Sequence, residues 1–99
     1  MVRFEWDPAK ARANRQKHGV SFEDAMHVFE DPHALFEQDR VAESGEPRWQ
    51  AIGLVEGIAV LLVAHAVRDE GEVVRLISAR RATRKERSRY EQTRTEDVS

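Results

Sequence analysis

The fold is decided by the stretch from Arg48 to Arg80, which reads RWQAIGLVEGIAVLLVAHAVRDEGEVVRLISAR. Its apolar segments are rich in valine, leucine and isoleucine and are separated by short glycine-containing turns, a pattern typical of strands joined in hairpins. The predicted strands are Arg48–Val55, Ile58–Val67 and Val73–Arg80, with turns at 56–57 and 69–71. Because connections this short reverse the chain direction, the strands should form an antiparallel meander.

The N-terminal segment predicts a strand followed by a helix. Apolar and charged residues alternate over Val2–Trp6, as expected for a half-buried strand. Asp7 can cap the first turn of a helix that begins at Pro8 and ends near His18. Gly19 can then adopt the left-handed conformation that closes the helix.

Ser21 predicts the start of a second helix, because its hydroxyl can cap the first turn. The apolar side chains that would face the core recur at helical spacing and are Phe22, Ala25, Met26 and Phe29. Asp31 and Pro32 should end this helix. The following polar stretch Glu37–Pro47 shows no periodicity and is interpreted as a mobile loop.

A capping box formed by Thr83 and Glu86 predicts a last helix that begins near Arg84 and fades by Thr95. Its few apolar residues require stabilisation by capping, by a Glu86–Arg89 pair and by docking through Tyr90. The expected class is α+β: an N-terminal strand, two helices, a three-stranded antiparallel meander and a C-terminal helix. With 99 residues, the chain should form a single domain spanning residues 1–99.

The charges are segregated along the chain, although the net charge is only -2. The segment 21–47 has one base, Arg40, among the acids Glu23, Asp24, Glu30, Asp31, Glu37, Asp39, Glu43 and Glu46. The segment 80–90 has one acid, Glu86, among the bases Arg80, Arg81, Arg84, Lys85, Arg87 and Arg89. A local basic patch acts on an anionic ligand despite distant acids, so the C-terminal segment is a candidate nucleic-acid contact. A solvated charged helix is the alternative interpretation.

The sequence lacks the residues or motifs that several classes of chemistry require. The chain has no cysteine, so disulfides, thiolate metal sites and cysteine nucleophiles are excluded. No zincin, calcium-loop, phosphate-loop, dinucleotide or serine-elbow motif occurs, and we expect neither a metal nor another cofactor. No apolar run is long enough to span a membrane, and the charged N-terminus lacks the pattern of a signal peptide, so we expect a cytoplasmic location.

The remaining candidates are arginine, lysine, histidine and tyrosine, which can cleave RNA without a metal. The ribose 2′-hydroxyl is an internal nucleophile held close to the scissile phosphorus. Arginine can stabilise the charge that develops on the phosphate, and a histidine such as His18 can transfer a proton. The alternative interpretation of His18 is a cap of the first helix. In the middle strand, His65 should have Arg75 as its cross-strand neighbour.

Two separated motifs resemble those of the BrnT family of toxins. The first comprises Phe4-Glu5-Trp6-Asp7-Pro8-Ala9-Lys10, Asn14 and Lys17-His18-Gly19-Val20-Ser21-Phe22. The second comprises Ile77-Ser78-Ala79-Arg80-Arg81-Ala82-Thr83, Glu86-Arg87 and Tyr90, and His65 and Arg68 also match. The resemblance covers most of the chain outside 37–48. Ala66 stands where a hydroxyl residue is expected in relatives.

The resemblance implies a RelE-like fold and a toxin that cleaves RNA without a metal and so inhibits translation. It implies neutralisation by a BrnA-type antitoxin with a ribbon-helix-helix domain, through which alone operator DNA would be bound. The catalytic residues that it implies are Lys17, His18, Arg68, Arg80 and Arg81. The expected RNA-binding residues are Arg75, Arg84, Lys85, Arg87 and Tyr90. The alternatives are a binding module without catalysis and a degenerate toxin that retains only its antitoxin or nucleic-acid contact.

Overall fold

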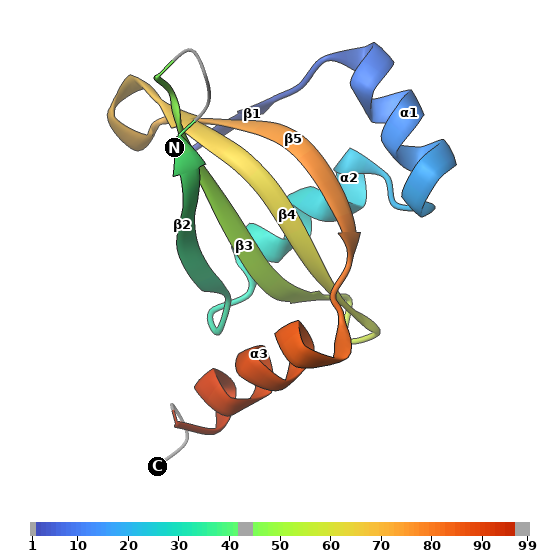
Figure 1. Cartoon of the computed structure of the whole chain (residues 1–99), viewed down its shortest axis with the longest axis vertical. Helices are drawn as coiled ribbons and strands as arrows, with labels where there is room; N and C mark the ends of the chain where they lie inside the picture. Colours follow the sequence, from blue (N-terminus) through green and yellow to red (C-terminus); the bar gives the residue numbers. More distant parts are fainter. Residues whose placement is uncertain (1, 42–44, 97–99) are drawn as a thin grey trace.

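The structure, a computed structural model, describes residues 2–41 and 45–96, with side chains for 2–39 and 45–95. It contains one five-stranded sheet with helices on both sides (Figure 1). The elements in chain order are β1 (Arg3–Glu5), α1 (Pro8–His18), α2 (Phe22–Ala25), the 3-10 helix η1 (Met26–Glu30), β2 (Leu35–Val41), β3 (Pro47–Val55), β4 (Ala59–Arg68), the 3-10 turn η2 (Asp69–Gly71), β5 (Val73–Arg81) and α3 (Arg84–Glu96). No helix in these ranges is long and apolar enough to cross a membrane.

The strands lie in the order β1-β5-β4-β3-β2. The predicted antiparallel pairing of β3, β4 and β5 is confirmed. The predicted three-stranded meander is too short, because β2 adds a fourth antiparallel strand and β1 pairs in parallel with β5. At the β3–β4 hairpin, the backbone φ angles of Glu56 and Gly57 are 54° and 69°. Such positive values suit the tight hairpin turn predicted there.

The prediction of a loop over Glu37–Pro47 is wrong for its first part, because β2 extends through Val41. Because the residues from Glu37 to Arg40 are polar, this part of β2 shows no apolar periodicity in the sequence. The backbone hydrogen bonds of β3 stabilise the strand instead, and Phe36 packs at its N-terminal end against Phe29. The predicted loop position of 42–44 lies outside the described residues.

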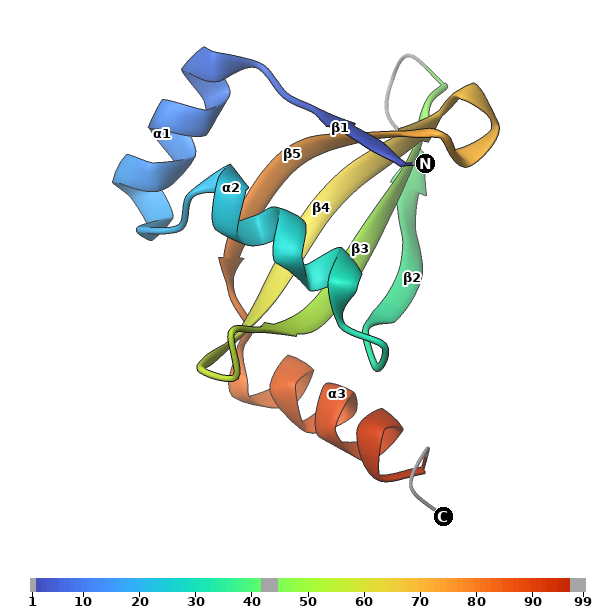
Figure 2. The same ribbon diagram turned by 180° about the vertical axis from the view of Figure 1, so that it is seen from behind.

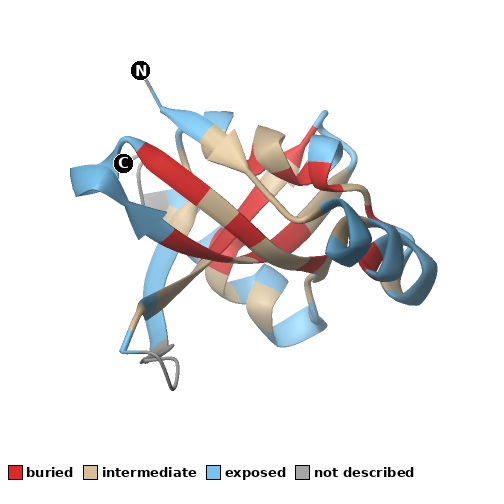
Figure 3. Ribbon diagram, turned by 90° about the horizontal axis from the view of Figure 1, so that it is seen from above, coloured by how far each residue is buried: buried red, intermediate tan, exposed pale blue. Residues whose placement is uncertain are grey.

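The two sides of the sheet pack against different helices (Figure 2). On the side covered by α1 and α2, a large core contains Phe22, Ala25 and Val28 packed against strand residues such as Val63 and Leu76. On the opposite side, α3 covers a smaller core formed by Ile52, Leu62 and Tyr90. The buried residues accordingly lie mainly along the central strands and the inner faces of the helices (Figure 3).

The predicted limits of α1 are confirmed. The Ala9 amide donates to the Asp7 carboxylate at 2.8 Å, and Gly19 has a φ of 70°. The Asn14 side chain then joins α1 to β5. Its Oδ1 accepts from the Ala79 amide at 3.0 Å, and its Nδ2 donates to the Ala79 carbonyl at 2.9 Å. One side chain thus supplies hydrogen bonds to the Ala79 amide and carbonyl of β5, which lie beyond the end of β1.

The second helix begins as predicted, since the Ser21 hydroxyl accepts from the Asp24 amide at 3.0 Å. Only Phe22–Ala25 is α-helical, and the chain then tightens into the 3-10 helix η1. The expected apolar stripe still faces the sheet, with Ala25 buried and Met26 and Phe29 packed against the same core.

The predicted capping box of α3 is confirmed. The Thr83 amide donates to Glu86 at 2.9 Å, and the Glu86 amide donates to the Thr83 hydroxyl at 3.2 Å. The predicted Glu86–Arg89 pair is wrong, because Glu86 binds Arg80 and Arg89 binds Glu37 of β2. Tertiary contacts therefore replace the pairing that helical spacing alone suggested.

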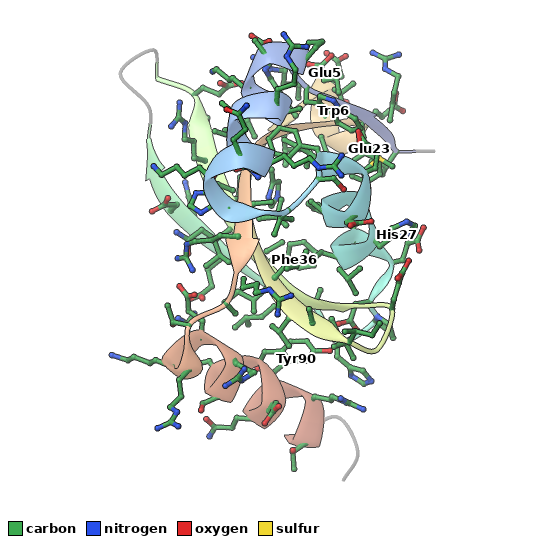
Figure 4. All side chains as sticks on the ribbon, turned by 90° about the vertical axis from the view of Figure 1, so that its right-hand side faces the viewer. Glu5, Trp6, Glu23, His27, Phe36 and Tyr90 are labelled. Atoms are coloured by element: carbon green, nitrogen blue, oxygen red, sulfur yellow. The ribbon has the colours of Figure 1, made fainter. Side chains whose placement is uncertain are left out.

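Docking of α3 through Tyr90 is confirmed. Tyr90 is 1% exposed and points from α3 toward the strands (Figure 4). Its hydroxyl donates to the Asp31 carboxylate at 2.5 Å, and the Leu54 amide donates to the same carboxylate oxygen at 2.8 Å. Burial and this hydrogen bond raise the pKa of Tyr90 to about 12. Burial alone would raise the pKa of Asp31, but its hydrogen bonds with Leu54, Tyr90 and His33 lower it.

The expected pairing of His65 with Arg75 is also wrong, because a register shift between Ala64 and His65 places Leu76 opposite His65. His65 is buried, with its ring edge-on to Phe29 at a centroid distance of 4.9 Å. Burial lowers the pKa of His65, so the imidazole is neutral near pH 7 and belongs to the core.

Candidate functional site

The strand register places a set of polar and charged side chains on the α3 side of the sheet. Residues that pair across adjacent strands project to the same side, and alternate residues along each strand share that side. Ile52 and Leu62, which contact α3, fix the orientation. Two rows then follow beyond α3: Glu37, Gln50, Ala64 and Ser78, and next Arg48, Ala66, Arg75 and Glu5. We call these two rows the open face, because α3 lies across only one end of the sheet (Figure 1).

Arg48 is the cation of the open face that lacks a complete set of partners. Its side chain is half-buried, and its Nε is buried with no hydrogen-bond partner. Within the described residues, no carboxylate forms an ion pair with Arg48. A buried guanidinium nitrogen without an acceptor is costly, so the Arg48 side chain would gain by turning this nitrogen outward to an anionic ligand oxygen.

Arg75 lies two strands away from Arg48 in the same row, with Ala66 between them. Arg75 contacts the Glu5 carboxylate at 3.4 Å, and Arg68 contacts the same oxygen at 3.5 Å. Arg68 also donates from Nε to Glu46 at 2.8 Å, and this hydrogen bond lowers the pKa of Glu46. Arg68 and Arg75 at this end of the sheet therefore bind two carboxylates, with Glu5 shared between them.

Arg80 lies beside α3, in the row that borders the open face. Its guanidinium binds Glu86 through two parallel hydrogen bonds of 2.8 and 3.0 Å. This hydrogen bonding lowers the pKa of Glu86 from 4.5 to about 2. Because Arg80 belongs to β5 and Glu86 to α3, the pair fixes the start of the helix against the end of the strand.

The middle of the open face has small and neutral side chains. Ala64 lies between Gln50 and Ser78, and Ala66 lies in the next row with no exposed surface. The small side chain of the partly exposed Ala64 leaves space beside Gln50 and Ser78, which offer hydrogen bonds there. In the described part of the chain, no group of three histidine or acidic side chains is arranged to bind a metal ion.

The structure separates the five predicted catalytic residues. Lys17 and His18 end α1 on the opposite side of the sheet from α3. Arg81 projects to that opposite side as well and, together with Gly19, lines a shallow hollow of about 160 Å³. Arg80 projects to the α3 side, and Arg68 lies at the far end of the β4–β5 hairpin from both.

The predicted RNA-binding residues also differ in their surroundings. Arg75 lies on the open face, and Arg84, Lys85 and Arg87 are exposed on α3. The structure contradicts the prediction that Tyr90 binds RNA, because the side chain is 1% exposed and its hydroxyl is bonded to Asp31. Its position instead stabilises the docking of α3.

Sequence reasoning missed Arg48, Gln50 and Ser78 as candidate site residues. Arg48 and Gln50 lie on β3 and Ser78 lies on β5, with Gln50 and Ser78 on either side of Ala64 and Arg48 in the next row. The period-2 alternation of Arg48 and Gln50 was a usable signal, since both had to project to the same side of β3. Ser78 could be recognised only from the strand register, because an irregularity in β5 changes the side on which its residues project.

Residues 6–86 match a family described as "Ribonuclease toxin, BrnT, of type II toxin-antitoxin system". The chain belongs to the BrnT toxin family. The solved crystal structure of the Brucella abortus ribonuclease toxin BrnT is similar to it, with 25% sequence identity and a TM-score of 0.63. That similarity covers 85% of this chain and 100% of the Brucella chain. No protein of curated function matches this BrnT-family chain.

Family membership and the fold comparison confirm the resemblance to BrnT toxins. The family description assigns its members to type II toxin-antitoxin systems, in which the toxin has a protein antitoxin. For this BrnT-family chain, the open face then offers a specific surface on which the chemistry of a ribonuclease can be placed.

Proposed function

We propose that this toxin is a metal-independent endoribonuclease whose RNA-cleaving site is the open face. The observation that carries the proposal is the guanidinium of Arg48, which is half-buried on this face with an Nε that lacks an acceptor. A phosphate oxygen would complete the hydrogen bonding of this atom. The small, partly exposed side chain of Ala64 in the adjoining row leaves room for the RNA backbone.

The proposed reaction uses the RNA as its own nucleophile. The 2′-oxygen attacks the adjacent phosphorus and loses its proton, while the bond from phosphorus to the 5′-oxygen breaks and that oxygen gains a proton. The products are a 2′,3′-cyclic phosphate and a 5′-hydroxyl. Arg48 and Arg75 would bind the phosphate oxygens and stabilise the additional charge of the transition state.

The supporting arginines would act at the two ends of the bound strand. Arg68 forms ion pairs with Glu46 and Glu5 and would position the RNA backbone at one end. Arg80 is held by Glu86 and would meet the strand at the other end, next to the exposed Arg84 and Lys85 of α3. The described part of the open face has no histidine, so proton transfer would involve a carboxylate or water. We therefore place His18 and Lys17 outside the reaction.

Growth arrest would follow from RNA cleavage that blocks translation. We also propose a RelE-like relationship for the fold and a BrnA-type antitoxin with a ribbon-helix-helix domain, which alone would contact operator DNA. These points rest on the sequence resemblance together with family membership.

The test is incubation of antitoxin-free protein with total RNA in EDTA, with mapping of the new ends. We expect 2′,3′-cyclic phosphate ends from the wild type. Arg48→Gln and Arg75→Gln should each slow cleavage by about 100-fold, the usual effect of removing one transition-state donor. Arg12→Gln is the matched control, because Arg12 is exposed on α1 across the sheet.

The results also decide between the alternatives. His18→Ala should cleave at the wild-type rate, whereas a loss equal to that of Arg48→Gln would move the site to the end of α1. Intact RNA that is retarded in a gel by every folded variant would instead identify a binding module without catalysis. Thermal unfolding of each variant shows whether it is folded.

A further inference from the structure

The two edges of the sheet differ in how their backbone groups are covered. At one edge, β1 pairs with β5 over Val73–Arg75, and Asn14 binds both backbone groups of Ala79 further along. At the other edge, no strand of the described chain pairs with the outer side of β2. An uncovered edge strand presents unpaired amide and carbonyl groups to any extended segment.

The outer part of β2 also carries an exposed aromatic side chain. Phe36 is 48% exposed, although its ring lies 5.8 Å from that of Phe29 and 6.3 Å from that of His65 (Figure 4). Pairing with β3 is regular from Leu35 to Gln38, so the strand around Phe36 has the geometry needed to accept another strand. An apolar side chain on such a strand would cover the exposed part of the Phe36 ring.

The charges of β2 define which partner suits this edge. Glu37 and Asp39 are exposed. Glu37 projects to the side opposite Phe36, where it pairs with Arg89, and Asp39 follows at the irregular end of the strand. A second copy of this chain would bring these acidic side chains close to one another across an antiparallel pair, which is unfavourable. A partner with basic residues would have the opposite charge.

These features together specify the partner's sequence pattern. Side chains alternate between the two sides of an added strand, so one set would meet Phe36 and the other would lie on the side of Glu37, with Asp39 next along the same edge. We propose that an extended antitoxin segment, alternating apolar and basic residues, binds the outer side of β2 as a sixth strand. The proposal rests on the protein antitoxin of the type II family and not on the RNA-cleaving site.

Backbone hydrogen exchange of the toxin alone and in its purified complex with the antitoxin tests the contact directly. We expect the outward-pointing amides of 35–38, which alternate with those that face β3, to exchange at least about tenfold more slowly in the complex, because new inter-strand hydrogen bonds protect them. Protection confined to the hollow around Gly19 and Arg81, or to the β3, β4 and β5 residues of the open face, would overturn the proposal. Protection of β2 that depends only on toxin concentration would assign this edge to a second copy instead.

A double variant tests the two chemical determinants. Phe36→Ser combined with Asp39→Lys should raise the dissociation constant of the complex at least about tenfold, since apolar contact and charge attraction are both lost. The matched control combines Ile58→Ser with Glu23→Lys, which alters an exposed apolar residue and an exposed acid away from β2 and should change binding less than twofold. Wild-type affinity in the first variant would contradict the proposal. Its RNA cleavage should be unchanged, which separates this test from that of the catalytic site.

Discussion

At the scale of single residues, Glu86 links the fold to the candidate site. Its carboxylate closes the capping box with the Thr83 amide and binds both terminal nitrogens of Arg80. The Arg80 charge that the sequence suggested for phosphate binding is thus matched by a carboxylate in the free protein. Arg48 remains the better candidate for direct contact with phosphate, because its Nε has no such acceptor.

Replacing Glu86 by Gln should destabilise the protein in a pH-dependent way. Glutamine can still accept from the Thr83 amide, so the change removes mainly the charge. The folded-state pKa of Glu86 is about 2, below its ordinary 4.5, so the ionised form stabilises the protein above pH 4.5 and this contribution is lost as pH falls toward 2. After allowance for the partial exposure of Arg80, we expect a loss of about 1–2 kcal/mol at pH 7.

Urea unfolding of wild type and Glu86→Gln between pH 7 and pH 3 measures this effect. The difference in unfolding free energy should be constant down to about pH 5 and fall to less than half by pH 3. Glu91→Gln serves as a control, because Glu91 is exposed on the same helix. An equal difference at both pH values would show that the charge of Glu86 is not responsible.

At the scale of elements, α1 is joined to the sheet by a polar side chain. Asn14 is buried and forms three hydrogen bonds to backbone groups, two with Ala79 and one with the Val20 carbonyl at 3.0 Å. The remaining α1 side chains are largely exposed, so this contact and the partly buried Ala11 hold the helix against β5. Asn14 belongs to the first motif that resembles BrnT toxins, and the structure shows that it joins α1 to the sheet.

Asn14→Ala should therefore lower the free energy of unfolding by about 2–3 kcal/mol, although alanine favours helix. The loss arises because the Ala79 amide and carbonyl stay buried without their partner. Chemical denaturation provides the measurement, and Gln16→Ala, an exposed amide two positions along the same helix, provides the comparison. Equal stability of the two variants would mean that water replaces the Asn14 contacts without cost.

At the scale of the whole molecule, net charge is a poor guide to RNA binding. The chain has a formal charge of -2, but the structure places Arg48, Arg75 and Arg80 on one side of the sheet. The carboxylates Glu5 and Glu86 partly balance them, so binding requires close approach of the phosphates. Each phosphate contact of this kind releases counterions from the RNA, so the affinity falls as the salt concentration rises.

RNA binding should accordingly weaken as salt concentration rises. With a single-stranded oligonucleotide whose 2′-hydroxyls are replaced by hydrogen, cleavage is blocked and binding can be followed by fluorescence anisotropy. Three phosphate contacts predict a slope of about -2 for log affinity against log salt, and Arg48→Gln should reduce its magnitude by about 0.7. A slope near zero would show that the backbone phosphates are not the contacts.

Local sequence patterns were sufficient for most secondary structure. The caps at Asp7, Ser21 and Thr83 set where the helices begin, because their side chains bond to backbone groups only two or three residues away. The tight turn at Glu56-Gly57 determined the β3–β4 hairpin in the same local manner. These features can be predicted because their physical causes lie within a few residues.

The sequence by itself thus determined the α+β class, the meander of β3, β4 and β5, and the resemblance that family membership confirms. Only the tertiary structure decided that β2 is a strand, since the hydrogen bonds that stabilise it come from β3. It also decided which arginines share a side of the sheet. A one-residue shift in β5 reverses the side on which a side chain projects, and that shift depends on contacts between strands that no local pattern contains.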